Sequence, residues 1–82
     1  MSDSKDVRTI AVVGAGIMGR GIAHVSAMGG FTTVLNDVSD EFLEKARGLI
    51  RRDMEKGVEI GKASTEAMEE AWSRLSFHAD LP

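Results

Sequence analysis

Three glycines near the start of the chain have the spacing of a phosphate-binding turn. Gly14, Gly16 and Gly19 form the pattern G-x-G-x-x-G directly after a short apolar run. In a dinucleotide site the first glycine permits a tight turn, the second lets the backbone approach a pyrophosphate, and the third lets the following helix pack closely. The N–H groups of Ile17 and Met18 then face the phosphates, with the helix dipole behind them. The pattern alone is weak, but its place between a predicted strand and a predicted helix favours a dinucleotide cofactor.

Asp37 supplies the second element of such a site. It lies 37 − 14 = 23 residues beyond the first glycine, close to the interval of about 20 that is expected for the acid that binds the ribose. A carboxylate there accepts the ribose hydroxyls and repels a 2′-phosphate. The next residue, Val38, offers no cation for that phosphate. The sequence therefore predicts NAD rather than NADP.

Each of these residues also has a plainer interpretation. The glycines could form only a strand-to-helix turn, and Asp37 could be only an acid before a helix. The order of strand, glycines, helix, strand and acid favours the cofactor site over that interpretation. For Arg20, contact with a phosphate and full exposure to solvent are equally favoured interpretations. His24 lies among small residues in the same predicted helix, and packing or surface exposure is favoured over catalysis.

The first half of the chain predicts a strand, a helix and a strand. Residues 9–13 (TIAVV) are apolar or β-branched without alternation, which predicts a strand of a parallel sheet that is buried on both faces. Residues 17–28 predict a helix that ends at Gly29-Gly30. Residues 32–36 (TTVLN) predict the second strand. The helical residues expected to face the sheet are Ile17, Gly21, Ile22 and Val25.

The second half predicts two helices and a strand. Ser39 is a good N-cap, so a helix should run from there to about Lys56. A bend or loop is expected at Gly57 and Gly61, and Ser64 or Thr65 should cap a third helix. The residues at helical spacing are Phe42, Ala46, Leu49, Ile50, Asp53 and Met54 in the second helix, and Met68, Ala71, Trp72 and Leu75 in the third. Residues 75–78 predict a third strand, and Trp72 is expected to anchor the third helix against the sheet. The fold class is therefore α/β, the incomplete first half of a doubly wound Rossmann-type parallel sheet (β-α-β-α-α-β).

Composition narrows the class of protein. With 82 residues there is room for one small domain, which we divide into a disordered leader at 1–6 and a partial NAD-binding Rossmann domain at 7–82. A net charge of −3, with basic residues spread among acids, argues against nucleic acid as a partner. The absence of cysteine excludes disulfides and thiolate chemistry. No stretch predicts a signal peptide or a membrane span, and a cytoplasmic protein is expected.

The segment Ile10–Ala23 (IAVVGAGIMGRGIA) closely resembles the opening of the 3-hydroxyacyl-CoA dehydrogenase family, including its 3-hydroxybutyryl-CoA dehydrogenase type. The resemblance covers almost the whole chain after the leader and continues through Val34–Asp37, Leu43–Ile50, Arg51–Ala63 and Arg74–Phe77. Related β-hydroxyacid dehydrogenases share a Gly-x-Met-Gly turn, but many of them have Asn-Arg after the second strand. This chain has Asp37-Val38 at that place.

The resemblance implies an NAD-dependent oxidoreductase of fatty acid metabolism that transfers hydride between NAD and the 3-hydroxyl carbon of an acyl-CoA. It assigns cofactor binding to Gly14, Gly16, Ile17, Met18, Gly19 and Asp37. It assigns CoA binding to the helical hairpin, with Arg52, Lys56 and Lys62 as candidates. The family's catalytic histidine, its glutamate partner and the substrate-orienting serine and asparagine come from regions beyond residue 82. Neither His24 nor His78 matches the catalytic position, so the chain is expected to be a truncated form that is inactive alone.

Two further readings stay open. Without a fourth strand, Ile10–Val13 would form an open apolar edge of the sheet, so self-association is expected, as a dimer through that edge or by exchange of a helix. The chain could then be a non-catalytic nucleotide-binding or self-associating fragment. An FAD-binding domain shares the glycine turn, but the continuation Met18-Gly19-Arg20-Gly21 makes it less favoured.

Overall fold

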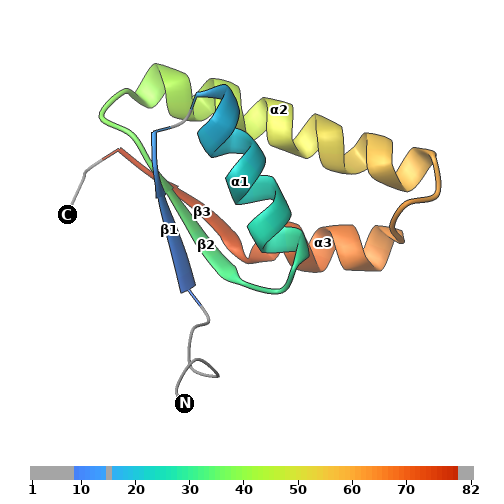
Figure 1. The fold of residues 1–82 in the computed structure, drawn as a ribbon. Coiled ribbons are helices and arrows are strands. Elements are labelled where there is room, and N and C mark those ends of the chain that lie inside the picture. Colours follow the sequence, from blue (N-terminus) through green and yellow to red (C-terminus); the bar gives the residue numbers. More distant parts are fainter. Residues whose placement is uncertain (1–8, 15, 80–82) are drawn as a thin grey trace, which may run out of the picture.

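The computed structural model describes residues 9–14 and 16–79, so the predicted leader at 1–6 lies outside the described residues. The elements follow the predicted order (Figure 1), and the α/β fold class is confirmed. They are β1 (Thr9–Val13), α1 (Ile17–Met28), β2 (Thr32–Asn36), α2 (Asp40–Glu59), α3 (Thr65–Ser73) and β3 (Leu75–His78).

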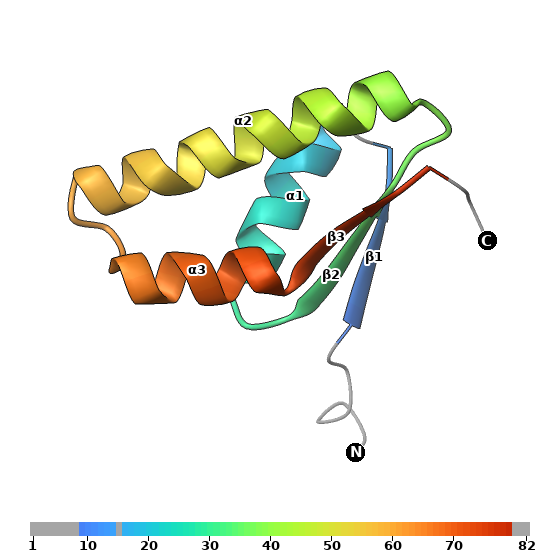
Figure 2. The ribbon, with the colours of Figure 1, turned by 180° about the vertical axis from the view of Figure 1, so that it is seen from behind.

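The strands form one parallel sheet with β2 between β1 and β3. Val12 pairs with Leu35, and Leu35 pairs with Phe77. Because the strands are parallel, their carboxyl ends meet at one edge of the sheet. The helices α2 and α3 form a hairpin that extends well beyond the strands (Figures 1 and 2). Within the described residues β1 is an outer strand.

Residues 9–14 and 16–79 cover only one face of this sheet. On β1 the side chain of Val12 is 8% exposed, whereas that of the next residue, Val13, is 68% exposed. The covered face of β2 carries Thr33 and Leu35, both fully buried. Successive right-handed crossovers in one direction place every connecting helix on the same side of a parallel sheet. The prediction of a strand buried on both faces is therefore wrong for the described part of the chain.

The packing face of α1 also differs from the prediction. Ala23 and Ala27 are fully buried, whereas Ile17 is 81% and Val25 71% exposed. Ile22 and Gly21 are exposed as well. The helix approaches the sheet so closely that only small side chains fit, and Gly19, Ala23 and Ala27 recur at the four-residue spacing of one helix face. The larger apolar side chains consequently lie on the opposite face.

The second helix begins as predicted, with the Ser39 hydroxyl accepting a hydrogen bond from the Phe42 N–H at 3.1 Å. Its buried residues are Leu43, Ala46, Ile50 and Met54. Phe42 was expected on this face but is 57% exposed, because Leu43 takes the inward position. The helix continues through Gly57 to Glu59, so the predicted break at Gly57 is wrong. Gly61, with φ +83°, forms the turn.

The third helix confirms the predicted face. Ser64 rather than Thr65 caps it, accepting a hydrogen bond from the Ala67 N–H at 3.0 Å. Met68 and Ala71 are buried on α3. Leu75, which was expected on the same helical face, is instead the buried first residue of β3, because α3 ends at Ser73. Trp72 packs against Phe77 of β3 with ring centroids 6.1 Å apart, which anchors α3 at the sheet.

Arg51 joins α2 to α3. Its guanidinium donates two hydrogen bonds to the Glu69 carboxylate, at 2.8 and 3.2 Å, and one to Glu55 at 3.0 Å. The same guanidinium lies 5.2 Å from the centre of the Trp72 ring. The hydrogen bonds from Arg51 lower the pKa of the Glu69 carboxyl, and attraction to the same cation adds to the effect. This bidentate pair fixes the two helices of the hairpin relative to each other.

This pair predicts a pH-dependent contribution to stability. The pKa of Glu69 is lower in the folded chain than in the unfolded one. The pair therefore stabilises the fold above the unfolded value of about 4.3 and loses this effect as the pH falls through the folded pKa. Glu69→Gln should lower the Tm at pH 7 and lower it less near pH 3, as thermal denaturation by circular dichroism can show. Glu59→Gln, outside the network, should change the Tm little at either pH, and an equal effect of Glu69→Gln at both values would contradict the prediction.

Candidate functional site

The turn between β1 and α1 is tight and uses a backbone conformation that glycine adopts readily. Gly14 has φ +101°, in the region that side-chain-bearing residues rarely adopt. Its N–H donates a hydrogen bond of 2.7 Å to the carbonyl oxygen of Asn36 at the end of β2. Gly16 is the N-cap of α1, and its carbonyl accepts from the Arg20 N–H at 2.8 Å. The turn thus brings the start of α1 to the carboxyl edge of the sheet.

Gly19 occupies a place where no side chain fits. A Cβ atom built on Gly19 would overlap the carbonyl oxygen of Gly14 and would lie 3.5 Å from Cγ1 of Val12. Both contacts involve backbone or buried core atoms, which cannot move aside without shifting β1. Gly19 is therefore the residue that allows α1 to pack against the first strand.

Gly16 borders open space instead. A Cβ atom built there would have no other atom within 4 Å. A pocket of about 160 Å³ begins at this point and is lined by Gly16, Ile17, Arg20, Phe42, Lys45 and Ala46. Ile17 and Met18 are 81% and 78% exposed in the first turn of α1. The N-terminus of α1, where backbone N–H groups attract anions, therefore faces accessible space.

Asp37 lies at the same edge of the sheet, directly after β2. Its N–H donates to the carbonyl oxygen of His78 at 3.1 Å, and its carboxylate accepts from the Ser39 N–H at 2.9 Å. The hydrogen bond of Gly14 to Asn36 ties the glycine turn to the residue before Asp37. The structure thus brings the predicted turn and the predicted ribose acid together where parallel sheets bind nucleotides.

Asn36 is a residue of this edge that sequence reasoning missed. Its side chain is 6% exposed, and its Oδ1 has no hydrogen-bond partner among the described residues. Buried polar atoms are nearly always hydrogen-bonded, so this atom marks a polar position with capacity for one more contact. The carboxylate of Asp37 can accept hydrogen bonds from ribose hydroxyls, and the space at Gly16 before the N-terminus of α1 can take a phosphate. This edge therefore fits a dinucleotide.

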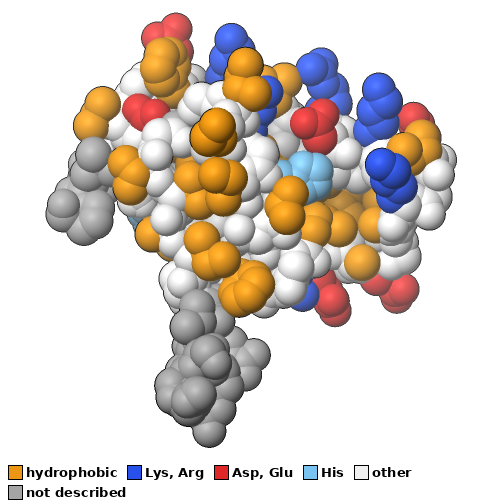
Figure 3. Space-filling view, in the orientation of Figure 1, with side chains coloured by type: hydrophobic (Ala, Val, Ile, Leu, Met, Phe, Trp, Pro, Cys, Tyr) orange, Lys and Arg blue, Asp and Glu red, His pale blue; other side chains and the backbone are white. Residues whose placement is uncertain are grey.

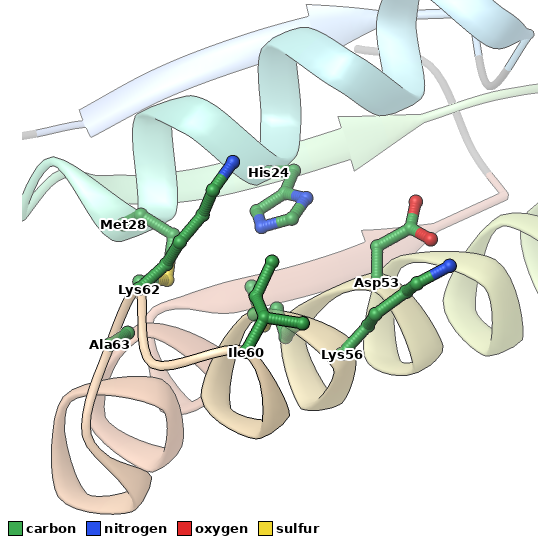
Figure 4. Close-up of a pocket in the computed structure, with 9 residues that line it drawn as sticks. His24, Met28, Asp53, Lys56, Ile60, Lys62 and Ala63 are labelled. Atoms are coloured by element: carbon green, nitrogen blue, oxygen red, sulfur yellow. The ribbon is translucent and has the colours of Figure 1, made fainter.

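A second pocket, of about 430 Å³, lies between α1 and the α2–α3 hairpin (Figure 4). Its lining residues are His24, Met28, Asp53, Met54, Lys56, Gly57, Ile60, Lys62 and Ala63. Two of the three predicted CoA contacts, Lys56 and Lys62, are among them, whereas Arg52 is exposed on α2 away from the lining. Within the part of the chain that the structure describes, neither lysine forms an ion pair. Their charges are therefore available to an anion.

In the space-filling view, Lys and Arg side chains lie along α2 and the turn after it, with acidic and apolar side chains between them and a histidine nearby (Figure 3). Apolar side chains lie over α1 in the same view. Among residues 9–14 and 16–79, no cluster of histidines and acids could hold a metal ion. No helix in those same ranges has both the length and the apolar character needed to cross a membrane.

Comparisons with known proteins agree on one family. Residues 9–82 match the model of the 3-hydroxyacyl-CoA dehydrogenase NAD binding domain. A probable 3-hydroxybutyryl-CoA dehydrogenase of Deinococcus radiodurans is 44% identical over 70 residues, which is 85% of this chain and 25% of that protein. The 3-hydroxyadipyl-CoA dehydrogenase of Escherichia coli is 40% identical over 76 residues, covering 93% of this chain and 16% of that protein.

Solved structures give the same result. The crystal structure of 3-hydroxybutyryl-CoA dehydrogenase from Escherichia coli superposes with a TM-score of 0.88 at 38% identity, over 93% of this chain and 16% of that one. The chain thus spans about a quarter or less of the length of these relatives.

Proposed function

The chain belongs to the 3-hydroxyacyl-CoA dehydrogenase family as an NAD-binding domain, and on that premise we propose that it is the cofactor-binding part of an oxidoreductase acting on acyl-CoA. The whole protein would transfer hydride between NAD and the 3-hydroxyl carbon of the acyl chain. The observation that supports this most strongly is the meeting of Gly14 and Asp37 at one edge of the sheet. No described residue is proposed as catalytic.

We propose that the cofactor lies across this edge. The pyrophosphate would occupy the space at Gly16, held by the N–H groups of Ile17 and Met18, while Gly14 and Gly19 keep the turn tight. Asp37 would accept hydrogen bonds from the adenosine ribose. NAD, when bound, supplies the hydride acceptor, and the chain's own contribution is to bind and orient it.

The pocket between α1 and the hairpin is the proposed place of the CoA moiety. Lys56 and Lys62 would pair with its phosphates, because both lie at the pocket without an ion pair among the described residues. Arg52, one helical turn before Lys56, would be an outlying cation of the same site. Apolar side chains at Met28, Met54 and Ile60 offer a surface for the uncharged parts of the molecule.

Asp37→Ala tests the cofactor assignment. Loss of hydrogen bonds to a charged acceptor costs about 1.5–3 kcal/mol, so we expect NADH to bind roughly 10- to 100-fold more weakly. NADPH should bind the native chain weakly and the variant no worse. NADH can be titrated by energy transfer from Trp72, the single tryptophan. Asp40→Ala, an exposed acid three residues along, should leave the affinity within about twofold. Equal NADH binding by Asp37→Ala and native chain would refute the assignment.

We also propose self-association as an alternative or additional property. The supporting observation is a set of exposed apolar residues on and beside the outer strand, namely Val13, Ile17, Met18, Ile22 and Val25. An outer strand with uncovered apolar neighbours favours pairing with another chain.

Val25→Lys tests that proposal. Val25 is 71% exposed, so the change should not disturb the fold, yet it places a charge within the apolar surface. Sedimentation equilibrium should show dimers of the native chain and at least about tenfold weaker association of the variant, because each buried apolar side chain contributes about 1.5–3 kcal/mol. Ile60→Lys, on the hairpin, should associate like the native chain. A native chain that sediments as a monomer at high concentration would refute the proposal.

A further inference from the structure

His24 projects from α1 into the pocket that Lys56 and Lys62 line (Figure 4). In that view Lys62 stands on one side of the imidazole ring, and Asp53 and Lys56 stand on the other. Within the described residues the ring forms no hydrogen bond and no ion pair. Both ring nitrogens are therefore available to a ligand in the pocket.

The charges that face this ring come from two sides. α2 contributes Asp53 and Lys56, and the turn after α2 contributes Lys62. With the imidazole neutral, the two lysines and one aspartate leave one net positive charge. Protonation of His24 raises that charge to two, so the proton doubles the net charge of the pocket.

The other cations near α1 lie outside the lining of this pocket. Arg74, from the end of α3, donates a hydrogen bond of 2.8 Å to the carbonyl oxygen of Ala27 and approaches Glu70 at 3.8 Å. Arg20, one turn before His24 on α1, lines the pocket at the glycine turn. His24 is thus the one imidazole among the residues that line the hairpin pocket.

We propose that His24 is a proton-linked third cation of this pocket, which couples the binding of a phosphate group of CoA to pH. The proposal rests on the placement of CoA at Lys56 and Lys62 under the proposed function. Imidazole changes charge between about pH 5 and pH 8, and a charged imidazole donates to phosphate oxygens with both nitrogens. CoA binding then takes up a proton, and the affinity rises as the pH falls through that range.

The test compares the full native chain with His24→Gln by isothermal titration calorimetry with CoA at pH 6 and pH 8. Glutamine keeps a polar side chain without a charge, and its comparison with the native chain cancels the titration of CoA itself. A partly exposed charge pair contributes modestly to binding, so the native chain should bind CoA roughly three- to fivefold more tightly than the variant at pH 6 and equally at pH 8. Proton uptake, seen in buffers of different ionisation enthalpy, should occur in the native chain and be reduced in the variant. Equal affinities and equal proton uptake at both pH values would overturn the proposal.

Dephospho-CoA identifies which phosphate is bound. If the native advantage at pH 6 disappears with dephospho-CoA, His24 contacts the 3′-phosphate, and if it persists, His24 contacts the pyrophosphate. Both outcomes support the proposal.

Lys56→Ala and Lys62→Ala distinguish failure of the His24 proposal from failure of the proposed CoA placement. CoA binding that the lysine variants weaken but His24→Gln does not would overturn the His24 role alone. CoA binding that neither lysine affects, or no binding, would overturn both, while unchanged NADH binding shows that each variant is folded.

Discussion

Replacing Gly19 with alanine is expected to destabilise the fold by about 3 kcal/mol, near the upper end of the cost of overpacking. A Cβ atom at this position overlaps the carbonyl oxygen of Gly14, and relief requires α1 to move away from β1. A chain of 82 residues has a free energy of unfolding of only about 4–12 kcal/mol. The Tm should therefore fall by roughly 12–24 °C, which thermal denaturation by circular dichroism would measure. NADH binding should weaken with it, because the turn and the helix move together.

Gly48→Ala is the matched control. Gly48 lies in the middle of α2, and a Cβ atom built there would meet no atom within 4 Å. The same chemical change should therefore stabilise the chain by about 0.5–1 kcal/mol, since alanine favours a helix over glycine. A Gly19→Ala variant with the native Tm would show that α1 does not depend on this close contact.

Local signals in the sequence predicted the elements well. The β-branched runs at residues 9–13 and 32–36 coincide with β1 and β2. The N-cap at Ser39 could be predicted, and the one at Ser64 as one of two candidates with Thr65, because a hydroxyl that bonds the first turn needs only neighbouring residues. The break predicted at Gly57 was wrong because tertiary packing outweighs the local signal there. Glycine weakens an isolated helix, but the buried residues Ile50 and Met54 stabilise α2.

The face of α1 could not be predicted from hydrophobicity. Ile17, Ile22 and Val25 carry more apolar surface than Ala23 and Ala27. A prediction based on hydrophobicity therefore places these three larger side chains on the buried face of the helix. The distance between helix and sheet decides instead, and that distance is set by the contact of Gly19 with the turn. The spacing of Gly19, Ala23 and Ala27 was the available signal, because small residues four apart mark a face of close approach.

In the candidate site, too, local signals could be predicted from the sequence and the packing of helices could not. The positions of Gly14, Gly16 and Asp37 at the carboxyl edge of the sheet could be predicted, because each lies at a fixed place relative to its own strand. Lys45 and Phe42 line the pocket at Gly16, and His24 lines the one at the hairpin. Their places depend on how α1 crosses α2, which the spacing within either helix does not determine.

Gly16→Val is expected to abolish NADH binding, with an affinity at least about 100-fold lower, while the fold remains. The backbone of Gly16 has φ −74°, which any residue can adopt, and a Cβ atom there meets no atom within 4 Å among the described residues beyond its chain neighbours. The valine side chain would instead enter the space assigned to the pyrophosphate, whose close approach to the backbone requires glycine. The free energy of unfolding should change by less than about 1 kcal/mol. Fluorescence titration with NADH and thermal denaturation would measure the two effects.

Gly48→Val makes the same change at the exposed position on α2 and should leave NADH affinity within about twofold, and Gly16→Ala should fall between native and valine. Native NADH affinity in Gly16→Val would mean that the pyrophosphate lies elsewhere and that the glycines serve only to join β1 to α1.

Gly19→Ala and Gly16→Val together therefore distinguish a turn that serves packing alone from a turn that binds a cofactor. Packing alone predicts that Gly19→Ala is harmful and Gly16→Val harmless, because only Gly19 touches the chain itself. A cofactor site predicts that Gly16→Val removes the ligand from a chain that is still folded, since the atoms it displaces belong to NAD and not to the protein.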